Sequence, residues 1–178
     1  MRIGVPREIK PLEGRTGLIP AACSELVAAG HEVFVETGAG LESGYTDAAY
    51  QVAGAEIVAD AAALYARGEL IVKVKEPVEA DLQYLHAGHI LFSYLHLAAN
   101  LPLMHTLCAI GLTAVAFETV QDAAGALPLL APMSDVAGRL AVQLGTHLLH
   151  QPQGGKGVLL GGLAGGGHGL EYYSRMIF

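Results

Sequence analysis

Residues 1–36 read MRIGVPREIKPLEGRTGLIPAACSELVAAGHEVFVE, and this stretch decides the fold. Ile3–Pro6 and Glu32–Glu36 are short and rich in residues that favour strands, whereas Pro20–Ala29 is rich in alanine. Proline is favourable in the first turn of a helix, and Gly30 is well placed to end one. The stretch therefore predicts a strand, a helix and a second strand parallel to the first.

The same alternation of β-rich and alanine-rich segments continues as far as residue 117. Further strands are expected at Glu56–Val58, Leu70–Lys75, Ile90–Tyr94 and Thr113–Phe117, and further helices at Asp47–Gly54, Asp60–Arg67 and Leu101–Ile110. Strands that alternate with helices are typical of a parallel sheet. The fold class is therefore α/β, a Rossmann-like open, mostly parallel sheet with helices on both faces, followed by a long helix and a Gly-rich tail.

A long helix is expected after the sheet, beginning at Ser134 and ending at His150. Its apolar residues recur every four positions, and Ser134 has the hydroxyl of a good N-cap. The apolar positions are Val136, Leu140, Leu144 and Leu148. We therefore divide the chain into an α/β domain over residues 1–133, a connecting or oligomerisation helix over 134–150 and a Gly-rich tail over 151–178.

Composition excludes several classes of protein. Of the 178 residues, 52% are hydrophobic and 15% are charged, which is not the composition of a disordered chain. The formal charge of -7, with no cluster of Lys or Arg, argues against nucleic-acid binding. No apolar run is long enough for a membrane span and the start does not resemble a signal peptide, so we expect a cytoplasmic protein that does not bind membranes. Cys23 and Cys108 are expected to be reduced, buried thiols.

Three polar side chains follow predicted strands, where α/β proteins usually place their functional residues. They are Arg15 after the first strand, Lys75 at the end of the fourth and His96 after the fifth. A guanidinium and an ammonium can hold a carboxylate and a carbonyl oxygen, and an imidazole can transfer a proton near neutral pH. Each residue alone is weak evidence, because isolated Arg, Lys and His side chains are common on protein surfaces.

Four longer segments carry a family resemblance. They read MRIGVPREIKPLEGRTGLIP, VKVKEP, LFSYLHLAAN and LAPMSDVAGRLAVQLGTHLL. Together they resemble the amino-terminal half of bacterial alanine dehydrogenases, a family related to the amino-terminal domain of proton-translocating transhydrogenase. The resemblance extends over about residues 1–162 without a visible gap.

The resemblance implies roles for individual residues. Arg15 and Lys75 would bind the carboxylate and carbonyl of pyruvate or alanine, and His96 would be the acid/base. Ser134 would contact the cofactor, which is NAD in the complete family. Glu118 would line the cleft and bind substrate, or would only order the adjacent backbone. In the complete enzyme, NADH would deliver hydride to the imine of pyruvate.

The nucleotide-binding half of that family is not found in this sequence. No glycines occur with the spacing i, i+2 and i+5 that places backbone amides against a pyrophosphate. No second βαβ half follows the tail either. We therefore expect a truncated substrate domain that holds no cofactor, has no metal site and cannot catalyse the NAD-dependent interconversion of alanine and pyruvate by itself.

Two other functions remain open at this stage. One is a serine/histidine hydrolase of carboxylic esters, in which His96 is the base and Ser93 or Ser134 is the nucleophile. The other is an oligomeric binding or scaffold protein. In each case we expect a homo-oligomer, with contacts made through the apolar stripe of Val136–Leu149.

Overall fold

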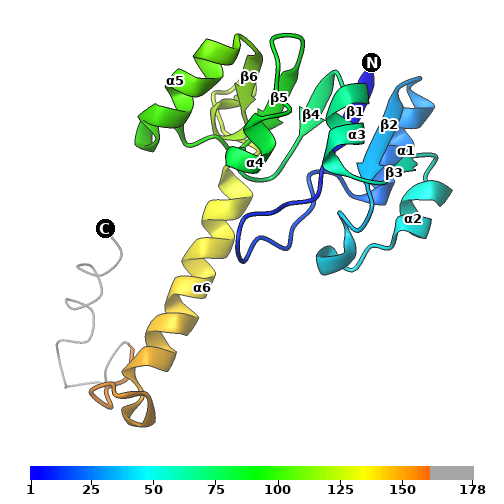
Figure 1. The fold of residues 1–178 in the computed structure, drawn as a ribbon. Helices are drawn as coiled ribbons and strands as arrows, with labels where there is room; N and C mark the ends of the chain where they lie inside the picture. Colours follow the sequence, from blue (N-terminus) through cyan, green and yellow to red (C-terminus); the bar gives the residue numbers. More distant parts are fainter. Residues whose placement is uncertain (161–178) are drawn as a thin grey trace. The chain divides into compact units, whose positions relative to one another are not determined.

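The computed structural model describes residues 1–160 and contains two compact units, Met1–Gln121 and Asp122–Phe178 (Figure 1). The predicted Gly-rich tail, 151–178, lies outside the described residues from 161 onward. Within the described part of the chain, no helix has both the length and the apolar content needed to cross a membrane.

The first unit is built on a parallel sheet of six strands in the order β3-β2-β1-β4-β5-β6, which confirms the predicted α/β fold. The strands are β1 Arg2–Val5, β2 Glu32–Glu36, β3 Glu56–Val58, β4 Leu70–Val72, β5 Ile90–Ser93 and β6 Thr113–Ala116. Ile3 of β1 lies opposite Val33 of β2 on one side and Leu70 of β4 on the other. The chain therefore starts in the middle of the sheet and extends it first to one edge and then to the other.

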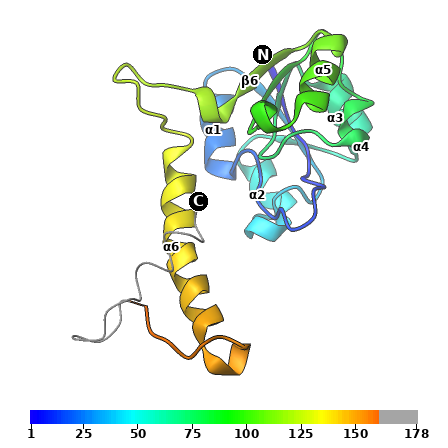
Figure 2. The ribbon, with the colours of Figure 1, turned by 90° about the vertical axis from the view of Figure 1, so that its left-hand side faces the viewer.

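Helices cover both faces of this sheet, as the sequence predicts. Figure 2 shows α1 (Pro20–Ala28) on one side and α3 (Ala61–Arg67), α4 (Glu79–Leu82) and α5 (Leu101–Ile110) on the other. The core on the first side includes Val35, Cys23 of α1 and Tyr50 of α2 (Asp47–Val52). The core on the second side contains Leu64, Leu91 and Leu107. A strand buried on both faces must be apolar along its whole length, which explains the short runs seen in the sequence.

Four strands end earlier than the sequence predicts, and β5 ends at Ser93 in place of Tyr94. Pro6 is not part of β1, and Phe117 opens a short 3₁₀ helix, Phe117–Thr119, in place of the last residue of β6. β4 ends at Val72 and not at Lys75. The amide of Val74 donates to the carboxylate of Glu8 at 2.6 Å. The Glu8 side chain, from the loop after β1, thus binds the Val74 amide, which continued strand pairing would otherwise use.

The second unit contains one long helix, α6, which extends over Ala131–Leu149. It begins before Ser134, so the prediction that Ser134 is the N-cap was wrong. Pro132 occupies the first turn, and the Ser134 hydroxyl donates instead to the carbonyl of Leu130, one turn back, at 3.5 Å. The apolar stripe of Val136, Leu140, Leu144 and Leu148 is exposed.

The two cysteines differ in environment, and the prediction that both are buried was correct only for Cys23. Cys23 is fully buried against the sheet, whereas Cys108 is exposed on α5. Burial raises the pKa of the Cys23 thiol to about 11, because the thiolate would lose its hydration.

Ellman's reagent should therefore modify one thiol of the native protein rapidly at pH 8, because only Cys108 is accessible and the thiolate is the reactive form. In denaturant, both thiols should react. A Cys108→Ser variant serves as the control and should show almost no rapid reaction before unfolding. Rapid modification of two thiols in the native wild type would contradict the packing of Cys23.

Candidate functional site

The order of the strands reverses between β1 and β4, since β1 continues to β2 on one side while β4 continues to β5 on the other. In open α/β sheets the loops diverge at such a point, and ligands bind at the carboxyl ends of the strands there. The loop after β1 and the residues after β4 both meet at this edge. It is the candidate site that the topology indicates.

The loop after β1 is held at two points, one at the end of β4 and one on the 3₁₀ helix Leu41–Ser43. A Cβ atom at Gly17 would lie 2.5 Å from the carbonyl oxygen of Val72, so only glycine allows the loop to pack this close to the end of β4. The Ser43 hydroxyl donates to the carbonyl of Gly14 at 2.8 Å. These contacts hold the intervening residues, Arg15 among them, beside β4.

Arg15 is paired with Glu13 from the same loop. Its Nε and Nη2 atoms donate to the two carboxylate oxygens at 2.8 and 2.6 Å, and its backbone amide donates to Oε1 at 3.0 Å. The Glu13 side chain is only 7% exposed, whereas that of Arg15 is 45% exposed. The hydrogen bond from Arg15 lowers the pKa of Glu13, and the charge of Lys75 adds to this effect. Glu13 therefore lies within the field of both predicted substrate-binding cations.

Lys75 is positioned through its backbone. The buried Glu8 carboxylate accepts the amides of Val74 at 2.6 Å and Lys75 at 3.4 Å. The other oxygen of Glu8 lies 3.5 Å from Nζ of Lys73, which is 1% exposed. Burial raises the pKa of Glu8, although the Lys73 charge and the two amides oppose the shift.

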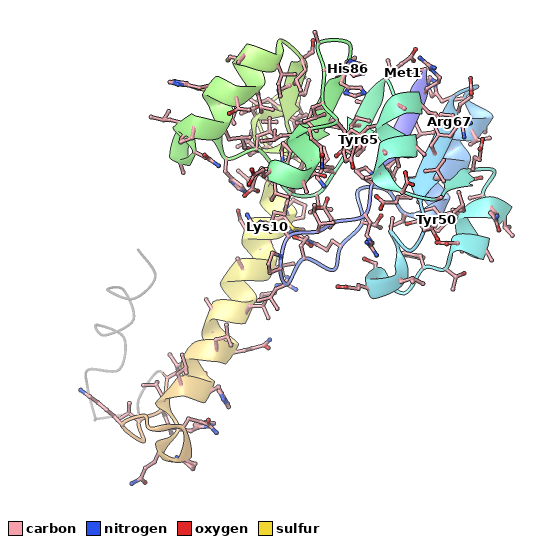
Figure 3. The ribbon with its side chains drawn as sticks, in the orientation of Figure 1. Met1, Lys10, Tyr50, Tyr65, Arg67 and His86 are labelled. Carbon is pink, nitrogen blue, oxygen red and sulfur yellow. The ribbon has the colours of Figure 1, made fainter. Side chains whose placement is uncertain are left out.

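Asp81 completes this buried cluster. Its carboxylate lies 3.3 Å from Lys73 Nζ and accepts the Tyr65 hydroxyl at 3.0 Å and the Val78 amide at 3.0 Å. Figure 3 labels Tyr65 on α3. Burial and the Asp81 charge raise the pKa of Tyr65, so its hydroxyl stays protonated and can donate. The backbone that carries Lys75 thus rests on a hydrogen-bonded cluster of buried charges.

A further ion pair joins the loop after β1 to the segment after β4. Nζ of Lys10, labelled in the loop in Figure 3, pairs with the Glu76 carboxylate. Burial raises the pKa of Glu76, but the Lys10 hydrogen bond and the charges of Lys10 and Lys75 together outweigh burial and lower it. The acidic residue beside Lys75 therefore stays ionised at neutral pH.

His96 follows β5 and has a left-handed backbone, with φ of 50°. The Glu118 carboxylate, from the turn after β6, accepts the His96 amide at 2.7 Å and the Leu95 amide at 3.2 Å. The ring of Tyr94 lies nearly parallel to the imidazole, with centroids 6.2 Å apart. These contacts give Glu118 the geometry of a residue that orders the backbone, which was one of its two predicted roles, and its contact with substrate remains a prediction.

The predicted residues Arg15, Lys75, His96 and Glu118 all follow strands at the same edge of the sheet. Arg15 and Lys75 are related through Glu13, since both charges act on that carboxylate. The ring of Tyr94 stacks on His96.

The serines predicted for a hydrolase are placed differently. Ser93 is fully buried, and its hydroxyl has no hydrogen-bond partner within residues 1–160, so the expected Ser93–His96 pair is not formed. Because side chains alternate along a strand, Ser93 lies on the same face of β5 as the core residue Leu91. Ser134 belongs to the second unit, where its hydroxyl bonds to the carbonyl of Leu130.

Sequence reasoning missed Glu8 and Glu13. Both are acidic residues in a loop, where carboxylates are usually solvated, and their partners are not all local. Glu13 gave one available signal, its position two residues before Arg15 in the Glu13-Gly14-Arg15 turn. Glu8 gave none, because its partners Lys73 and Val74 are distant in sequence.

This strand order defines an open α/β domain whose charged side chains gather at the switch point, at the carboxyl end of its sheet. The family model described as alanine dehydrogenase/PNT, N-terminal domain, matches residues 4–137. The chain belongs to that family.

Complete relatives are longer than this chain. It is 50% identical over 165 residues to the alanine dehydrogenase of Mycolicibacterium smegmatis, a match that covers 93% of this chain and 44% of the relative. It is 51% identical over 165 residues to the Bacillus subtilis enzyme, covering 93% and 43%. A solved structure of L-alanine dehydrogenase superimposes with a TM-score of 0.83 at 47% identity, covering 98% of this chain and 51% of that one. The chain thus spans about half the length of the relatives it matches.

Replacing Glu118 tests whether its carboxylate stabilises the backbone at Leu95 and His96. Glu118→Ala should lower the free energy of unfolding by about 1–3 kcal/mol, because it leaves the amides of Leu95 and His96 without their acceptor. Glu118→Gln keeps an acceptor oxygen and should lose less. Urea denaturation measures both. Glu25→Ala, at an exposed position on α1, is the control, and a Glu118→Ala loss no larger than that of the control would contradict this role.

Proposed function

We propose that this chain is the substrate-binding domain of an alanine dehydrogenase-like protein, and that it binds a small 2-oxo or amino acid through Arg15 and Lys75. The observation that carries the proposal is that Arg15 and Lys75 follow β1 and β4 at the switch point of the sheet, where Arg15 pairs with Glu13. Family membership and the similarity to alanine dehydrogenases support the same substrate class.

The chemistry of the two cations suits this role. A guanidinium donates two parallel hydrogen bonds to a carboxylate, and an ammonium is a compact charge for a carbonyl oxygen. His96 lies next to them in the order of strands, and its backbone is held by Glu118. We assign proton transfer at the carbonyl or amino group of the substrate to this imidazole.

Hydride transfer in the complete family would use NAD, and the residues of this chain do not fit that cofactor. A dinucleotide needs a glycine turn whose amides face its pyrophosphate, and the printed sequence has no glycines at i, i+2 and i+5. We therefore propose that this chain binds substrate without turning it over by itself.

Binding of pyruvate is the direct test, measured by titration calorimetry or by changes in amide NMR signals. Arg15→Met and Lys75→Met should each weaken binding at least about tenfold, because each removes a charged hydrogen bond to the ligand. The matched control is Arg2→Met, since Arg2 pairs with Glu69 at the amino-terminal edge of the sheet. No pyruvate binding by the wild type, or equal losses in all three variants, would contradict the proposal.

We also propose that the chain forms a homo-oligomer through the apolar stripe of Val136–Leu149. The exposed side chains of Val136, Leu140, Leu144 and Leu148 support this, because each buried square ångström of apolar surface contributes about 25 cal/mol. A second copy of the same helix can cover the stripe by symmetry.

Light scattering should therefore report a dimer or larger assembly at micromolar concentration. A Leu140→Glu, Leu144→Glu double variant should dissociate it, because two charges would be buried at the contact. Gly138→Glu is the control, since a side chain at Gly138 would meet no neighbouring atom. A monomeric wild type, or dissociation by the control as well, would refute the proposed contact.

A further inference from the structure

Charged side chains gather at the carboxyl edge of the sheet. Besides the exposed Arg7, four cations come from the segments after β1 and β4: Lys10, Arg15, Lys73 and Lys75. Lys10 pairs with Glu76, Arg15 with Glu13, and Lys73 with both Glu8 and Asp81. Within the described residues, Lys75 alone of the four makes no ion pair. The four cations are matched in number by the carboxylates of Glu8, Glu13, Glu76 and Asp81, and the charge of Lys75 acts on Glu13 and Glu76 without an ion pair.

Glu13 is the carboxylate whose pKa is lowered by both proposed ligand-binding cations, Arg15 and Lys75. It takes two side-chain hydrogen bonds from Arg15, and the charges of Arg15 and Lys75 both lower its pKa, so it is ionised at neutral pH. With 7% of its side chain exposed, it is poorly screened by water. Arg15 can donate hydrogen bonds to a ligand, but its charge is already balanced.

A second carboxylate lies beside Lys75 in the sequence. Glu76 follows Lys75 directly, and its Oε2 atom is buried without a hydrogen-bond partner among residues 1–160. Arg15 and Lys75 are the cations proposed to bind the single carboxylate and the carbonyl of a 2-oxo acid. A second negative charge on the ligand would be repelled by the carboxylates of Glu13 and Glu76, because like charges repel.

We propose that Glu13 is a specificity-determining residue, which restricts the site to monocarboxylic 2-oxo or amino acids and disfavours dicarboxylic ones by charge. The inference rests on the proposed function, since it concerns the same ligand site. In this role, the negative charge of Glu13 repels a second carboxylate of the ligand, in addition to its hydrogen bonds with the guanidinium of Arg15.

The variant Glu13→Gln separates charge from geometry. Oε1 of Glu13 accepts both Nε and the backbone amide of Arg15, and the carboxamide oxygen of glutamine can keep these two bonds. The bond from Nη2 to Oε2 and the negative charge are lost. Glu69→Gln is the matched control, because Glu69 also accepts both the side chain and the backbone amide of an arginine, Arg2, at the opposite edge of the sheet.

The experiment is calorimetric titration of the full chain with pyruvate and with 2-oxoglutarate at low ionic strength. The wild type should bind pyruvate more tightly. In Glu13→Gln the ratio of the two affinities should shift towards 2-oxoglutarate by roughly tenfold, the effect of one unit charge about 10 Å away at an effective dielectric constant of about 20. Glu69→Gln should leave the ratio unchanged.

A second comparison needs no variant. The 5-methyl ester of 2-oxoglutarate is no smaller than the parent acid but has one charge fewer, so the wild type should bind the ester roughly tenfold more tightly than the acid. Equal affinities would mean that size excludes the dicarboxylate, which would overturn the proposal even if Glu13→Gln did not fold.

The possible results distinguish a failure of the proposed charge selection from a failure of the proposed function. Absence of pyruvate binding in the wild type would overturn the proposed function and this inference with it. Pyruvate binding with an unchanged ratio in Glu13→Gln, or an equal loss of both ligands, would overturn only the charge selection and leave Glu13 as a residue that orients Arg15.

Discussion

The carboxylate of Glu8 is the interaction on which the rest of the site depends. It comes from the loop after β1, yet it accepts the amides of Val74 and Lys75 and lies beside the buried Lys73 ammonium. Without it, the amides of Val74 and Lys75 would lose their acceptor, and Lys73 would keep Asp81 as its buried ion-pair partner. Removing one partner of a buried ion pair is usually far more destabilising than replacing the whole pair by apolar residues. Glu8 therefore joins the two strands between which the site lies.

The fold was largely predictable from the sequence, and the site only in part. Short apolar runs between alanine-rich segments gave the strands and helices of the first unit, because burial on both faces requires them. The start of α6 was not predictable from Ser134, because Pro132 before it is compatible with the first turn of a helix. Arg15, Lys75 and His96 could be proposed because they follow strands. Glu8 could not, because its role depends on residues far away along the chain.

The same geometry that supports ligand binding argues against the hydrolase alternative. A serine nucleophile needs an accessible hydroxyl with a base within hydrogen-bond distance. Ser93 has neither, since alternation along β5 turns it into the core while His96 lies beyond the strand end, in the turn held by Glu118. Proximity in sequence is thus a poor guide to proximity of side chains at the end of a strand.

The central position of β1 has a consequence for folding. β1 pairs locally with β2, but its other neighbour is β4, and Ile3 lies opposite Leu70. Contacts between residues so distant in sequence form slowly, because a long loop must close first. During synthesis, one side of β1 therefore has no partner until β4 has been made. The segments that carry Arg15 and Lys75 follow β1 and β4, so the proposed ligand site can form only after the pairing with the greater separation in sequence. Ligand binding would then indicate that β1 and β4 have paired, whereas a measurement of helix content would not indicate this pairing.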